Sequence, residues 1–287
     1  MKFTVSVVIL ALTFACSKSN PTNSTPDKPT PDKEYVKRNK KKGFCITTKD
    51  GNEWVQKLND LHVSWHYSWG SDLKKDEPDS VEFVPMIWGA WGDFSGLDKK
   101  ITKIKALADS GKVHYLLGFN EPDNKDQANM SVDDAIKAWP KLMDAGVKLG
   151  SPACVHADRT WMKQFMAKAD SLEYRIDFVT VHWYGGKNAD NFINYLKKIH
   201  DLYNRPIWIT EFAVADWSAG SVSENKYTAS DVKKFLSEVL PAMEKLNFVE
   251  RYAWFSASTS SAALGTSALF DNSGNLTSVG KLYANYQ

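Results

Sequence analysis

The hydrophobic pattern switches repeatedly between eight short apolar runs and longer amphipathic stretches from residue 42 to residue 287, and this alternation constrains the fold more than any other feature. The apolar runs predict strands at residues 42–46, 63–69, 82–88, 113–119, 147–155, 176–184, 206–214 and 251–257. These runs are nearly continuous in apolarity, as parallel strands buried on both faces are. Residues 43–287, 245 in number, agree with the ~250 of one (β/α)8 domain. We therefore predict an α/β fold, a TIM barrel, in one domain.

The stretches between these runs predict helices at residues 54–61, 99–110, 132–145, 160–172, 190–202, 228–246 and 278–286. Ser131 is the expected N-cap of the third, with Asp134 three residues later as a capping carboxylate. A doubly wound open sheet is the rival fold. It rarely has eight evenly spaced units, and the sequence contains no Gly-rich phosphate loop.

The N-terminal residues predict export and a lipid anchor. Lys2 precedes an apolar run that is shorter than the ~20 residues of a spanning helix, as in a signal peptide over residues 1–15. Small residues before Cys16 resemble a bacterial lipobox, so we expect Cys16 to be lipidated; an ordinary signal peptide with an incidental cysteine is the alternative. Residues 16–42 are rich in Pro, Ser, Thr, Asn and Lys, which predicts a disordered tether. The expected location is the bacterial cell envelope, at the outer membrane or cell surface, with the face left open.

Charge and cysteine content exclude several classes of protein. The first 42 residues carry nine Lys or Arg and three Asp or Glu, a net +6, and the whole chain is +2, which leaves −4 on residues 43–287. A nucleic-acid-binding domain concentrates positive charge, so nucleic acid is not an expected partner. Cys45 and Cys154 fall in strands on opposite sides of the predicted barrel, too far apart for a disulfide, and no Cys/His cluster has metal spacing. We expect a monomer without metal or cofactor.

Two glutamates end predicted strands: Glu121 follows Asn120 at the end of the fourth, and Glu211 follows Thr210 in the seventh. Catalytic groups of TIM barrels lie at the carboxyl ends of strands. Paired carboxyl groups suit glycosidic cleavage, in which one protonates the leaving oxygen and the other attacks the anomeric carbon. The charge of an ionised partner should raise the pKa of the other carboxyl group. One such glutamate alone is more often solvated or ion-paired, so the inference depends on the pair.

Aromatic side chains near the predicted strand ends fit a sugar site, because sugars stack their C–H faces on aromatic rings. The candidates are Trp65, Tyr67, Trp69, Trp88, Trp91, Trp183, Tyr184, Trp217 and Trp254, with Asn120, His66, His182 and Ser256 as polar neighbours. Trp54, Trp139, Trp161 and Trp208 are instead assigned to packing, because they fall on helices or on the strand face opposite Glu211.

Several motifs together resemble glycoside hydrolase family 128, within the large retaining clan of (β/α)8 hydrolases. They are GFNEPD at 118–123, DFVTVHWYGG at 177–186, RPIWITEFA at 205–213 and RYAWFS at 251–256. The likeness extends over essentially all of residues 43–287. One departure is Ser68, which stands where the family pattern leads us to expect Asn.

The resemblance implies roles for individual residues. Glu121 would be the general acid/base and Glu211 the nucleophile, with Asn120 bonding the sugar 2-hydroxyl, Tyr184 orienting Glu211 and Trp254 forming a platform under the sugar. The implied substrate is a β-1,3-glucan such as laminarin or curdlan.

The sequence thus predicts an endo-acting, retaining β-1,3-glucanase. Two alternatives stay open: the same chemistry on a mannan or β-1,4-glucan, and a non-catalytic, surface glycan-binding lipoprotein. Retention of both carboxyl groups with Asn120 favours an enzyme over a binding protein. Endo and exo action are not distinguished, since the loop at residues 258–276 could either close over the site or lie on the surface.

Overall fold

A computed structural model describes residues 38–48 and 53–287. The predicted signal peptide, Cys16 and most of the tether therefore lie outside the described residues. Among those described, no helix is both long enough and apolar enough to cross a membrane.

The eight predicted strands are present in order, and all their ladders are parallel. They are β1 (Asn39–Cys45), β2 (Val63–Tyr67), β3 (Glu82–Phe83), β4 (Tyr115–Leu116), β5 (Lys148–Leu149), β6 (Val179–Trp183), β7 (Ile207–Phe212) and β8 (Val249–Phe255). Six form a sheet in the order β3-β2-β1-β8-β7-β6, and β4 pairs with β5 in a second sheet. Isolated parallel bridges join Met86 to Leu117 and Gly150 to Phe178, so they link the second sheet to both edges of the first.

The third, fourth and fifth strands are much shorter than predicted, with two residues each. Pro85 and Pro152 lie inside the predicted third and fifth runs, and proline has no N–H to donate to a ladder. The chain nevertheless stays extended beside its neighbours, because Leu117 N donates to Pro85 O at 2.9 Å and Ala153 N to Phe119 O at 2.8 Å.

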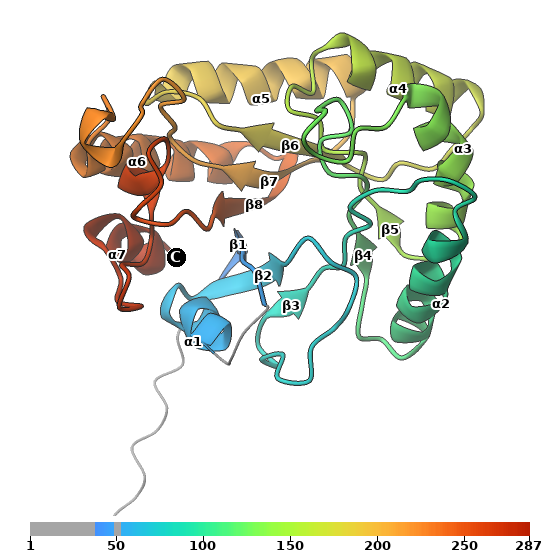
Figure 1. Cartoon of the computed structure of the whole chain (residues 1–287), viewed down its shortest axis with the longest axis horizontal. Coiled ribbons are helices and arrows are strands. Elements are labelled where there is room, and N and C mark those ends of the chain that lie inside the picture. Colours follow the sequence, from blue (N-terminus) through green and yellow to red (C-terminus); the bar gives the residue numbers. More distant parts are fainter. Residues whose placement is uncertain (1–37, 49–52) are drawn as a thin grey trace, which may run out of the picture. The chain divides into compact units, whose positions relative to one another are not determined.

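Within the described part of the chain, seven α-helices cover the outside of the strands (Figure 1). They are α1 (Glu53–Asp60), α2 (Ser95–Asp109), α3 (Val132–Met143), α4 (Thr160–Ser171), α5 (Ala189–Tyr203), α6 (Ala229–Lys245) and α7 (Ser278–Asn285), with 3-10 turns η1 (Val222–Glu224) and η2 (Gly265–Ser267). Ser131 caps α3 as predicted, accepting from Asp134 N at 3.1 Å. Thr228 and Asp231 form a reciprocal capping box at the start of α6.

The apolar core has two parts. The larger lies between strands and helices. The smaller is drawn only from the strands and their extensions, and includes Trp65, Phe178 and Trp208, with the last two stacked at 4.1 Å. Arg251, near the start of β8, lies over Trp208 at 4.3 Å and bonds Glu82 at 2.6 Å. These groups fill the interior at the amino ends of the strands, which leaves the carboxyl ends for a cavity.

The first strand begins at Asn39, three residues before its predicted start. Lys42, which we assigned to the tether, is fully buried. Its Nζ donates to the carbonyls of Tyr283, Ala284 and Tyr286 at 3.0, 3.1 and 2.5 Å. Polar composition concealed the first residues of this strand, because an ammonium group that satisfies buried carbonyls looks like a tether residue in the sequence.

Candidate active site

A cavity of about 970 Å³ opens at the carboxyl ends of the strands. Both predicted glutamates line it, together with Asn120, His182 and Tyr184. The structure therefore brings together five of the residues that the sequence singled out.

Glu211 reaches the cavity because β7 contains a bulge. Ile207 and Ile209 face the helices and Trp208 faces the interior, so regular alternation would turn residue 211 toward the helices. The β6–β7 register instead moves from Val181 opposite Ile209 to His182 opposite Glu211, which inserts Thr210 as an extra residue. Such a bulge re-aims the side chain that follows it.

Three donors hold the Glu211 carboxylate. Tyr67 Oη and Trp69 Nε1 donate to Oε1 at 2.9 and 2.7 Å, and Tyr184 Oη donates to Oε2. Burial, with the charge of Glu211, raises the pKa of both phenols well above the ordinary range. Both therefore keep their protons near neutral pH and stay donors. Each oxygen of Glu211 is held by rigid aromatic groups, so the carboxylate has a fixed orientation.

Glu121 sits in a strained backbone conformation, with φ at 41°. Its N–H donates to Ala153 O at 2.7 Å, which holds the turn in place. Asn124 Nδ2 donates to Oε2 at 3.0 Å, and His182 Nδ1 lies 3.0 Å from Oε1. Burial acts to raise the pKa of Glu121, but the bonds from His182 and Asn124 and the His182 charge outweigh it, so the pKa is lowered. The expected rise is wrong for this geometry.

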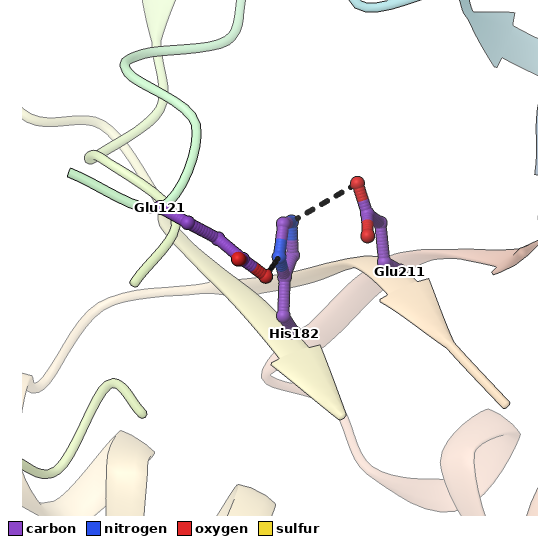
Figure 2. A group of neighbouring side chains, drawn as sticks. All are labelled: Glu121, His182 and Glu211. Carbon is purple, nitrogen blue, oxygen red and sulfur yellow. Dashed lines mark hydrogen bonds and ion pairs between the residues drawn. The ribbon is translucent and has the colours of Figure 1, made fainter. Parts of the chain in front are cut away.

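His182 lies between the two glutamates (Figure 2). Its Nε2 is 3.6 Å from Glu211 Oε1, on the opposite side of the ring from the Nδ1 contact with Glu121. Burial acts to lower the pKa of His182, but the charges of Glu211 and Glu121 and the bond to Glu121 outweigh it and raise the pKa. The three side chains therefore form one coupled group rather than two separate carboxyl groups.

The same three residues have the ligand types of a metal site. One ligand atom from each lies within 4.8 Å of the others. The Glu211 oxygens, however, already accept from Tyr67, Trp69 and Tyr184. A cation would have to compete with donors that the fold holds in place.

Asn120 presents an acceptor to the cavity. Its Nδ2 donates to Gln127 Oε1 at 3.1 Å, while its buried Oδ1 has no hydrogen-bond partner among the described residues. A buried polar atom without a partner is costly. A hydroxyl group in the cavity would satisfy it.

The aromatic candidates divide between the cavity and its surroundings. Trp69, Trp88, Trp183 and Tyr184 line it, as does Trp217, whose side chain is 67% exposed. Trp91 is exposed and packs on Trp88 at 5.7 Å, but it is not part of the lining. The expected cluster is therefore confirmed in part.

Four further residues that we expected at the sugar site do not line the cavity. Trp65 is fully buried in the interior core below the cavity. Trp254 is fully buried on the helix side, where it packs on Phe212 at 4.8 Å, and its neighbour Phe255 lines the cavity instead. His66 also lies outside the cavity and bonds Glu77 at 2.7 Å. Tyr67 contributes through Glu211 and does not line the cavity.

Sequence reasoning missed several lining residues. Asn124, Gln127 and His156 come from loops after β4 and β5, and Leu264 comes from the loop after β8. That loop therefore reaches the cavity wall. Residues of this kind have no periodic signal; only their position just after a strand end points to them. Cys45 and Cys154 are both buried free thiols, as predicted.

Comparison with known proteins identifies the family. Residues 43–283 match the family described as glycosyl hydrolase catalytic core. Alkali-sensitive linkage protein 1 of Schizosaccharomyces pombe is 30% identical over 232 residues, which are 77% of this chain and 40% of that protein. The chain thus spans less than half of this curated relative.

Solved structures agree with this. A family 128, subgroup I endo-β-1,3-glucanase variant from Amycolatopsis mediterranei, in complex with laminaripentaose, is 33% identical with a TM-score of 0.73, covering 87% of this chain and 100% of that one. A subgroup VII oligosaccharide-binding protein from Trichoderma gamsii shares the fold. It is 22% identical with a TM-score of 0.66, and the match covers 86% of this chain and 93% of that one. The chain belongs to the glycosyl hydrolase catalytic core family and, within it, to glycoside hydrolase family 128.

Proposed function

We propose that this chain is a retaining endo-β-1,3-glucanase in which Glu121 is the general acid/base and Glu211 the nucleophile. One observation carries the proposal: the two glutamates meet across His182 in the cavity, with an oxygen of each within 4.8 Å of the other. Carboxyl groups of retaining enzymes lie ~5–5.5 Å apart, against ~6.5–9.5 Å in inverting ones. The short separation favours direct attack over activation of an intervening water.

The reaction proceeds by double displacement. Glu121 protonates the glycosidic oxygen while a Glu211 oxygen attacks C1, so the bond from C1 to the leaving oxygen breaks and a glycosyl ester forms. Glu121 then takes a proton from water, which attacks C1 and releases Glu211. Asn120 Oδ1 is available to accept from a sugar hydroxyl next to the reacting carbon.

The choice of substrate rests on the relatives. The Amycolatopsis enzyme was solved with a β-1,3-linked oligosaccharide. A cavity of about 970 Å³ has room for several sugar units. A mannan or a β-1,4-glucan remains the alternative substrate.

The proposal includes the setting of the enzyme. We take the eight strands to be a (β/α)8 barrel whose wall is completed by the two isolated bridges. The signal peptide, lipidation at Cys16 and the tether would hold this monomeric domain at the cell envelope. The chemistry uses no metal or cofactor.

Product analysis tests the reaction and substrate together. The full chain is incubated with laminarin, curdlan, barley mixed-linkage glucan and mannan, and products are separated by chromatography. A ladder of β-1,3-gluco-oligosaccharides is expected. A single short product would instead indicate exo action, and retardation by laminarin in a gel without cleavage would favour a glycan-binding protein.

Variants test the assigned roles. Glu211→Ala should abolish turnover while laminarin binding persists, and Glu238→Gln on the exposed face of α6 is the matched control. NMR of the first product formed should show the β anomer. Wild-type turnover in Glu211→Ala, or an initial α anomer, contradicts the mechanism.

A further inference from the structure

We propose that His182 is a positioning residue that shares one proton with Glu121 and thereby supplies the proton used in the first chemical step. This inference rests on the proposed function and deepens it. It starts from the geometry of a single ring that contacts both glutamates from opposite edges (Figure 2).

The position of Glu211 fixes one ring proton. Nε2 is buried and has no hydrogen-bond partner among the described residues. It faces Glu211 Oε1 at 3.6 Å. A lone pair on Nε2 would be repelled by the carboxylate, whereas an N–H is attracted to it. Nε2 therefore carries hydrogen in every state in which Glu211 is ionised.

The contact between Nδ1 and Glu121 Oε1, at 3.0 Å, then has two arrangements. Either Nδ1–H of an imidazolium donates to the Glu121 carboxylate, or the protonated carboxyl group donates to Nδ1 of a neutral ring. The two differ only in which side of this hydrogen bond holds the proton. No other atom has to move, and the total charge is the same.

Water in the cavity decides between these arrangements. Solvation favours the ion pair, in agreement with the lowered pKa of Glu121 and the raised pKa of His182. A sugar that displaces water lowers the local dielectric, which penalises separated charges and favours the neutral pair. The proton then moves from Nδ1 to Glu121 and on to the glycosidic oxygen.

Once Glu211 has formed the ester, its negative charge is gone. His182 is then neutral, and the Glu121 carboxylate faces no imidazolium that would weaken it as a base. Glu121 can accept the proton of the attacking water, and hydrolysis of the ester restores the starting charges. The same pair thus serves both halves of the reaction.

Several other groups face this pair and are part of its titration. Asp123 lies in the segment after β4, Tyr184 directly follows β6, and His156 lies in the loop after β5. Tyr67 of β2 acts through its hydrogen bond to Glu211. Both phenols keep their protons, for the reason given above. Asp123 adds negative charge that favours a protonated ring, and His156 adds to the stabilisation of ionised Glu121.

The pH dependence of kcat/KM tests the proposal. In the wild type the basic limb reports loss of the shared proton. In His182→Asn the basic limb reports the ionisation of Glu121 alone. This limb should therefore move to lower pH by about one unit or more, toward the ordinary glutamate range near 4.3. Activity at acidic pH should recover to within about tenfold of the wild type. A uniform loss at every pH, with the limb unmoved, overturns the proposal.

His114→Asn is the matched control, since His114 is exposed and precedes β4. Its basic limb should coincide with that of the wild type.

A second measurement does not need turnover. In ¹⁵N NMR of histidine-labelled wild type, His182, assigned by its loss in His182→Asn, should titrate above the ordinary ~6.5, and its midpoint should fall in Glu121→Gln. A ring that stays neutral at pH 5 overturns the proposal. If the wild type cleaves no glycan, the proposed function fails, while this titration still tests the shared proton.

Discussion

Replacing Lys42 by methionine tests whether one buried ammonium group holds β1 against α7. The Lys42 Nζ donates to three carbonyls at the end of α7, at 3.0, 3.1 and 2.5 Å. Tyr283 O also accepts from Tyr286 N at 3.3 Å, and Ala284 O lies 3.2 Å from His62 Nδ1, so the loss of Lys42 is felt most at Tyr286 O. Positive charge also suits a helix C-terminus. Methionine keeps the length of the apolar stem and removes only the donors.

The magnitude follows from these contacts. A buried carbonyl left without a donor costs ~1–3 kcal/mol, and removing an ammonium group that must be desolvated offsets part of the total. We expect the free energy of unfolding to fall by about 2–4 kcal/mol. One kcal/mol lowers Tm by ~2–4 °C in a domain of this size, so Tm should fall by about 4–16 °C.

The assay is thermal and urea unfolding at pH 6. Burial, with the charge of Arg38, lowers the pKa of Lys42 to about 7, so at pH 6 the wild type keeps its full set of donors. Lys40→Met is the control, because Lys40 is exposed on the same strand and should change stability by less than ~0.5 kcal/mol. Equal Tm values for the two variants would refute the role of Lys42.

Three further variants test how side chains divide between binding, chemistry and packing. Trp217→Ala should raise KM for laminari-oligosaccharides about 2- to 12-fold with kcat unchanged, because it removes an exposed ring from the cavity wall; initial rates measure this. Tyr184→Phe removes a donor to Glu211 and should lower kcat/KM about 10- to 150-fold, with folding checked by circular dichroism. Trp254→Ala should reduce the free energy of unfolding by ~3–5 kcal/mol in urea titrations and leave KM unchanged, since the ring lies in the core. A raised KM would show instead that Trp254 contacts the sugar.

The order of the strands, the positions of the helices and the common location of the two glutamates could be predicted from the sequence because each depends on a local pattern. Apolar alternation survives even where prolines reduce a ladder to two residues, as around Pro85. Glu121 and Glu211 were found by their place at strand ends, which a parallel α/β fold gathers on one side.

The orientation and depth of the aromatic rings could not be predicted in the same way. Trp65 lies in β2 and fills the interior core, whereas Trp69, which the sequence placed in the same strand, lies just after the end of β2 and lines the cavity. Trp254 faces the helices, and its neighbour Phe255 lines the cavity where we expected Trp254, because neighbouring residues of a strand face opposite sides. We also expected Trp208 and Glu211 on opposite faces of their strand. The bulge at Thr210 turns both toward the interior, although Trp208 does serve packing as expected.

Two identical side chains acquire different proposed roles here through their surroundings. Glu211 lies in a strand among donors whose protons are held tightly, since burial and its own charge raise the pKa of both Tyr67 and Tyr184. These donors fix the orientation of its carboxyl group, as a nucleophile requires. Glu121 lies on a strained turn and contacts a side chain that can exchange a proton near neutral pH, His182. An acid that must later act as a base needs such a neighbour, so the difference between the two sites lies in which of them contacts a titratable donor at 3.0 Å.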